Sequence, residues 1–141
     1  MKKKVLLSLF LLALSALMLT SCADVMRSAN KNSAIAELDK LQAQLEEKGY
    51  VVLRADEAEV IAFAESLASG DGVLLEGEVV GVLEYSSPDA ESGKMFFTTV
   101  IAVTDKADAK AIAKVYESQG DDIGTVVKVT VKGRIITVLR G

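Results

Sequence analysis

The N-terminal stretch constrains this chain most, because it combines positive charge with a long apolar run. Lys2–Lys4 precede residues 5–19, which are apolar apart from two serines. As a helix this run would be about 22 Å long, shorter than the roughly 30 Å hydrocarbon core of a bilayer. The small residues Thr20 and Ser21 follow it. This pattern is typical of a secretory signal peptide over residues 1–21; an uncleaved membrane anchor is the alternative.

The residues around the only cysteine carry a second signal. Leu19-Thr20-Ser21-Cys22 resembles the lipobox of bacterial lipoproteins, which have a leucine, a small residue and the cysteine at matching positions. The resemblance implies diacylglycerol transfer to the Cys22 sulfur, cleavage between Ser21 and Cys22, and an amide-linked fatty acid such as palmitate. In these lipoproteins an aspartate after the cysteine favours inner-membrane retention. Ala23 stands there, so the resemblance implies a cell-envelope protein anchored by lipid in the outer membrane and facing the periplasm.

The amino-acid composition limits the partners and the catalytic groups that the protein could use. Removing residues 1–21 from the 141-residue chain would leave 120 residues, enough for one modest core. That mature chain would carry 13 basic and 20 acidic residues, a net charge of −7, which disfavours nucleic acid as a partner. Histidine is absent, and a lipidated Cys22 leaves no thiol for catalysis or zinc. We therefore predict no catalytic residues, no metal site and no cofactor.

The domain is expected to follow a short linker. Residues 22–32 are small and polar and lack a period, which predicts a lipidated tether before a single domain at 33–141. The domain should begin with a helix at 33–48, whose apolar stripe consists of Ile35, Leu38, Leu41 and Leu45. This stripe could pack on its own domain, or it could join copies of the chain into an oligomeric structural subunit of the envelope.

The rest of the chain alternates between strand and helix patterns. We predict strands at 50–54, 73–85, 94–104, 125–131 and 134–139, with helices at 57–69 and 106–119. Asp56 and Glu59 predict a capping box, and Lys132-Gly133 predicts a two-residue hairpin turn.

This order predicts an α+β fold, an antiparallel sheet with helices on one face. It resembles the ferredoxin-like βαββαβ arrangement with an extra C-terminal strand and an N-terminal helix. A small OB-type barrel is the alternative. Residues 105–141 also resemble half of a BON domain, a module of envelope proteins.

Three carboxylates are the candidates for catalysis. Glu76, Glu78 and Glu84 share one face of the strand predicted at 73–85, the first two roughly 7 Å apart. Glycosidases use carboxylate pairs at about that spacing, so a small carboxylate-dependent hydrolase or carbohydrate-active enzyme is one alternative function. Acidic residues are usually exposed, however, and a solvated strand face explains them as well.

Glycines and aspartates complete the candidate sites. Gly77 and Gly81 could open a groove for a ligand or partner, or they could mark a bulge or a helix packed on bare strand. Asp71, Asp121 and Asp122 in predicted turns could offer oxygens to calcium, but their spacing is not that of an EF-hand. These patterns favour a lipid-anchored, non-enzymatic binding or interaction module with an envelope protein as its partner.

Overall fold

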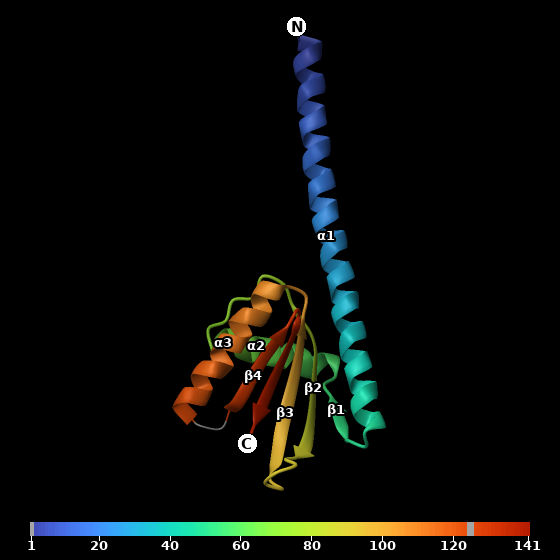
Figure 1. Cartoon of the computed structure of the whole chain (residues 1–141). Coiled ribbons are helices and arrows are strands. Elements are labelled where there is room, and N and C mark those ends of the chain that lie inside the picture. Colours follow the sequence, from blue (N-terminus) through green and yellow to red (C-terminus); the bar gives the residue numbers. More distant parts are fainter. Residues whose placement is uncertain (1, 124–125) are drawn as a thin grey trace.

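The structure, a computed structural model, has one sheet between two layers of helices (Figure 1). The structure describes the backbone of residues 2–123 and 126–141, and the side chains of residues 25–119 and 126–141. In chain order the elements are α1 (Lys2–Glu47), β1 (Val52–Arg54), α2 (Glu57–Ser69), β2 (Val79–Pro88), β3 (Met95–Val103), α3 (Lys106–Ile123), β4 (Val126–Lys132) and β5 (Ile135–Arg140).

The five strands form an antiparallel sheet in the order β1-β2-β3-β5-β4. The predicted α+β class, the antiparallel pairing and the order of helices and strands are confirmed. β1 and β4 are the outer strands, and no pairing joins them within the described residues. The sheet is therefore open, unlike the OB-type barrel that was the alternative.

Helices α2 and α3 cover one face of the sheet. α2 begins at the predicted capping box: the Asp56 carboxylate accepts from the Glu59 amide at 2.8 Å, and the Glu59 carboxylate accepts from the Asp56 amide at 3.2 Å. The core beneath α2 and α3 consists of Leu67, Val73, Val79, Val82, Ile101, Val103, Ala109, Ile112, Ala113, Tyr116, Ile136 and Val138.

The C-terminal part of α1 covers the opposite face. This second core consists of Ala34, Leu38, Leu45, Leu83, Val100 and Ala102. α1 ends in a Schellman motif, in which the Tyr50 amide donates to the Leu45 carbonyl at 3.1 Å and the Gly49 amide donates to the Glu46 carbonyl at 3.0 Å. The predicted apolar stripe thus packs on its own sheet.

The N-terminal side of α1 differs from the expectation of a tether. Residues 22–32 are helical, and α1 continues through them from Lys2 without a break. Neither glycine nor proline occurs before Gly49, so no strong helix breaker interrupts this stretch. Figure 1 shows the N-terminal half of α1 extending past the sheet, away from the β2–β3 turn.

β2 starts later and ends later than predicted. Residues 73–78 are not in a strand, and the first strand residue is Val79. Their alternating pattern does resemble a strand, but amides in this segment bond to side chains at the start of α3. At its other end β2 continues through Pro88, which pairs with Met95.

The C-terminal hairpin turns one residue later than predicted. Gly133 and Arg134 form the turn, and Val131 lies opposite Ile136, whereas a turn at Lys132-Gly133 would place Val131 opposite Arg134. Gly133 has φ of 61°. A positive φ at the first turn residue is typical of a type II′ turn and explains why the glycine begins this one.

Candidate functional site

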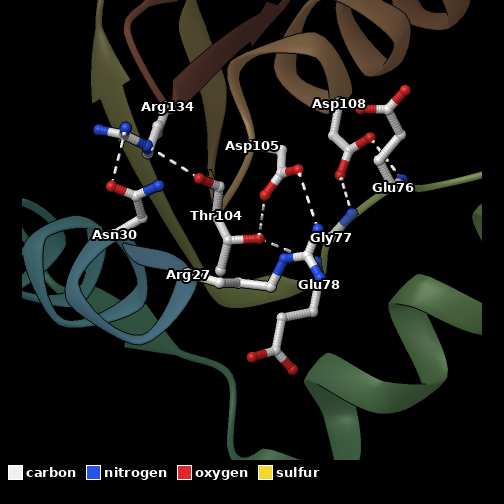
Figure 2. Close-up of polar contacts among 9 residues, drawn as sticks. All are labelled: Arg27, Asn30, Glu76, Gly77, Glu78, Thr104, Asp105, Asp108 and Arg134. Atoms are coloured by element: carbon white, nitrogen blue, oxygen red, sulfur yellow. Dashed lines mark hydrogen bonds and ion pairs between the residues drawn. The ribbon is translucent and has the colours of Figure 1, made fainter. Parts of the chain in front are cut away.

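Polar side chains gather where β3 ends and α3 begins (Figure 2). Asp108, in the first turn of α3, is only 2% exposed. Its carboxylate oxygens accept hydrogen bonds from the amides of Glu76 at 2.9 Å and Gly77 at 2.8 Å. The helix dipole also favours a carboxylate at this position. Asp108 therefore pairs two amides of a segment that has no strand partner for them.

Thr104 is a second fully buried polar residue of this cluster. Its hydroxyl accepts from the Glu78 amide at 3.0 Å and donates to the Asp105 carboxylate at 2.9 Å. Its backbone carbonyl accepts from Nε of Arg134 at 2.9 Å. Thr104 thus links the segment before β2, the start of α3 and the β4–β5 turn.

Three contacts join α1 to the same cluster. Asn30 accepts from Arg134 at 3.0 Å, Arg27 pairs with Asp105 at 3.7 Å, and Lys31 pairs with Glu78 at 3.1 Å. We call Arg27, Asn30, Lys31, Glu76, Gly77, Glu78, Thr104, Asp105, Asp108 and Arg134 the polar junction. In the described part of the chain every buried side-chain nitrogen and oxygen has a hydrogen-bond partner, so the buried polar groups of the polar junction are paired within the protein.

The two glycines proposed to open a groove lie under other parts of the chain. A Cβ on Gly81 would lie 2.5 Å from Cδ2 of Leu38, because α1 packs directly on β2 there. A Cβ on Gly77 would overlap the side chains of Thr104 and Asp105. The register of β2 also shifts between Val79 and Gly81. The alternative explanation, a bulge beneath a packed helix, describes Gly81, and neither glycine opens onto a groove.

The three candidate carboxylates are not brought together. Glu76 and Glu78 precede β2, so they do not share a strand face, and Glu78 is paired with Lys31. Glu84 lies further along β2, opposite Leu53 of β1. All three side chains are exposed. This arrangement does not form the acid and base pair that a glycosidase needs.

Of the three aspartates considered as calcium ligands, only Asp71 has a described side chain. Asp71 accepts a hydrogen bond from Gln119 at 3.1 Å. α3 continues to Ile123 rather than ending at Gln119, so Asp121 and Asp122 are helical, and their side chains lie outside the described residues. Where side chains are described, no group of three or more histidine, cysteine, aspartate or glutamate residues could hold a metal ion.

A groove of about 690 Å³ crosses the sheet on the α2/α3 side. Its lining includes Val51, Leu53, Glu84, Phe97, Thr99 and Arg140. Leu53, Glu84 and Thr99 lie opposite one another on neighbouring strands, in register with the buried Val138. The groove therefore continues the face that forms the main core. Hereafter this feature is called the sheet groove.

One end of the sheet groove is bounded by a cation stacked on an aromatic ring. The Arg140 guanidinium lies 5.3 Å from the centroid of the Tyr116 ring. Burial raises the pKa of the Tyr116 hydroxyl above its ordinary value, and the nearby Arg140 charge opposes that shift. The Arg140 guanidinium is therefore positioned against α3 by the Tyr116 ring.

The predicted lipidation site lies on α1. Ser21 and Cys22 are within this helix, and their side chains lie outside the described residues. From Cys22 to Arg27, which contacts the domain, the helix rises about 7.5 Å at 1.5 Å per residue. Among residues whose side chains are described, no helix is long and apolar enough to cross a membrane.

Sequence reasoning missed the residues that organise both features. Asp108 lies one helical turn before the buried Ile112, so an acidic residue at helical spacing from an apolar one was the available signal. Arg134 follows Gly133 in the turn, and nothing in the sequence pattern indicated its contacts. The sheet groove exists because α2 and α3 leave part of the sheet uncovered. The strand patterns around Leu53 and Phe97 do not indicate how far those helices extend over the sheet.

Comparison with known proteins adds no identity: no family model, curated protein or solved structure matches this chain.

Proposed function

We propose that this protein is a lipid-anchored, non-enzymatic binding module of the bacterial cell envelope. Its anchor is lipid on Cys22, and its domain faces the periplasm from the outer membrane. The observation that carries the proposal is the lipobox-like Leu19-Thr20-Ser21-Cys22, placed directly before a domain that has an open apolar groove. A thioether-linked diacylglycerol and an amide-linked chain bury dozens of methylenes at about 0.8 kcal/mol each, which makes attachment lasting.

The arrangement of side chains supports binding rather than catalysis. The candidate carboxylates Glu76, Glu78 and Glu84 are exposed and dispersed, and the buried polar groups of the polar junction are engaged with one another. The sheet groove instead combines exposed apolar side chains such as Leu53 and Phe97 with hydroxyl groups, Arg140 and a single acidic residue. Mostly apolar walls with few polar groups are typical of binding sites.

The anchor is tested by metabolic labelling with an alkyne fatty acid, followed by mass spectrometry of the N-terminal peptide. We expect the wild-type protein to incorporate the label and to begin at Cys22. Cys22→Ala should remain unlabelled and uncleaved. Ser21→Ala, which keeps a small residue before the cysteine, is the matched control and should be labelled normally. A Cys22→Ala protein that is processed and fractionates with membranes unchanged would refute the proposal.

The membrane assignment has its own test. Ala23→Asp places an aspartate directly after the acylated cysteine, the arrangement that favours inner-membrane retention in the lipoproteins this N-terminus resembles. On a density gradient, wild-type protein should follow the outer-membrane fraction and Ala23→Asp should move toward the inner membrane. Wild-type protein in the inner-membrane fraction would contradict the assignment while leaving lipidation intact.

A further inference from the structure

Apolar side chains are exposed together in the sheet groove. Leu53 is 66% exposed and Phe97 is 60% exposed, whereas Ile101, on the same face of β3 as Phe97, is fully buried. A second groove of about 460 Å³, between β1 and α2, shares Leu53 and Glu84 with the first, so the two are continuous. Apolar residues exposed as a group mark an interaction surface.

The acidic charge of this surface is available to a partner. Glu84 is exposed between Leu53 on β1 and Thr99 on β3, and it forms no ion pair with any residue in the described part of the chain. Glu59 of α2, whose carboxylate also accepts the Asp56 amide in the capping box, lines the adjoining groove. Carboxylates beside apolar walls attract a ligand with complementary positive charge.

The basic residues along the two grooves are already engaged. Arg54 donates to Asp39 at 3.0 Å and to Gln42 at 3.1 Å, both on α1. Arg140 is stacked over Tyr116. Arg54 is thus paired with a carboxylate, whereas Arg140 keeps its charge at the β5 end of the sheet groove, so a cationic side chain of a ligand is favoured toward Glu84 on β2.

A second copy of this chain does not fit the groove. In a two-fold interface the same patch meets itself, which would bring Glu84 of one copy toward Glu84 of the other. The mature chain would also carry a net charge of −7, so two copies repel one another. A partner of opposite charge is favoured over self-association.

The shape of the sheet groove fits a helix. It spans β1 to β5, which is three strand spacings or about 14 Å across. An α-helix with its side chains is about 10–12 Å in diameter. The floor is a sheet face beside α2, and helices pack on such faces through an apolar stripe. A third helix placed there would extend the layer already formed by α2 and α3.

We propose that the sheet groove binds an amphipathic helix of another envelope protein. The apolar stripe of that helix packs on Leu53 and Phe97, and a lysine or arginine of the same helix pairs with Glu84, which lies on β2 between β1 and β3. This inference names the partner class for the proposed binding module, and it rests on that function only for the compartment where the partner is met.

The test uses the protein as it is isolated from the native envelope, reconstituted in phosphatidylcholine nanodiscs. The probe is a fluorescein-labelled 14-residue peptide with leucines at helical spacing and lysines elsewhere, and a second peptide carries glutamates in place of the lysines. Fluorescence anisotropy gives both apparent dissociation constants, and protein-free nanodiscs give the background. We expect the Leu/Lys peptide to bind at least about tenfold more tightly than the Leu/Glu peptide.

Variants locate the binding. Leu53→Ser and Phe97→Ser remove exposed side chains and should each weaken Leu/Lys binding by about tenfold, with circular dichroism unchanged. Glu84→Lys should reduce the preference for the Leu/Lys peptide. Glu47→Lys makes the same charge change at an exposed position of α1, behind the sheet, and should leave the preference within about twofold of wild type.

Several results would overturn the inference. Unchanged binding by the Leu53 and Phe97 variants would place the peptide elsewhere. An effect of Glu47→Lys as large as that of Glu84→Lys would show that net charge alone attracts the peptide. Self-association through the groove, seen as a dimer that Phe97→Ser disrupts, would assign it to a second copy. Groove binding without fatty-acid labelling would refute the anchor alone, and labelling without groove binding would refute this inference alone.

Discussion

Asp108→Ala removes the side chain on which the segment before β2 depends. The carboxylate is 2% exposed and accepts two backbone hydrogen bonds, from Glu76 at 2.9 Å and from Gly77 at 2.8 Å. Alanine can accept neither of them. We expect the segment to loosen from the start of α3 and the domain to lose stability.

The size of the stability loss follows from the two amides that lose their acceptor. A hydrogen bond to a charged group contributes about 1.5–3 kcal/mol, and a buried amide left unpaired costs about 1–3 kcal/mol. Glu76 is exposed and Gly77 is half-buried, so water can reach the first amide more easily than the second. We therefore expect Asp108→Ala to lower the free energy of unfolding by about 3–4 kcal/mol. In a domain of this size that corresponds to a fall in Tm of roughly 12–16 °C.

Thermal unfolding of the mature protein, followed by circular dichroism, measures this change. Asp108→Asn keeps the volume and one acceptor oxygen, so it should lose about half as much. Glu117→Ala, at an exposed position of the same helix, is the control and should stay within about 0.5 kcal/mol of wild type. If Asp108→Ala were as mild as Glu117→Ala, the two amides would be solvated in the folded protein and the reasoning would be wrong.

Two further predictions concern α1 packing and pH. Gly81→Ala places a Cβ 2.5 Å from Cδ2 of the buried Leu38, so it should lower the free energy of unfolding, measured by urea denaturation, by about 1–2 kcal/mol. The double variant with Leu38→Ala should lose less stability than the sum of the two single variants. Burial raises the pKa of Tyr116 in the folded state, so its contribution to stability is present below the unfolded value of 10.0 and is lost as the pH rises through the folded value. Wild type should therefore lose more stability between about pH 8 and 11.5 than Tyr116→Phe, and equal losses would contradict this explanation.

The parts of the fold that depend on neighbouring residues were predictable. The capping box needs only Asp56 and Glu59, three residues apart, and it forms as predicted. The stripe of Leu38 and Leu45 likewise identified the buried side of α1, because a helical period is a local property. Gly133 indicated a turn, although its position within the turn was misjudged by one residue.

The errors arise where distant residues decide the structure. Residues 73–78 alternate like a strand, but Asp108, which bonds two of their amides, lies about thirty residues further on. Residues 22–32 lack an apolar period because the contacts that hold Arg27 and Asn30 to the domain are polar. The contacts made by Asp108, and those made by Arg27 and Asn30, cannot be inferred from the sequence pattern of the segments that they hold in place.

The polar junction relates the proposed anchor to the proposed binding surface. It lies at the end of β3 near Val103, whereas Phe97 in the sheet groove lies toward the β2–β3 turn, about 20 Å further along the strand. Figure 1 shows that turn at the opposite end of the sheet from the N-terminal half of α1. A lipid on Cys22 would therefore hold the polar junction beside the membrane and point the groove away from it. Because the contacts of Arg27, Asn30 and Lys31 fasten α1 to the domain, the anchor would fix the orientation of the groove as well as its location.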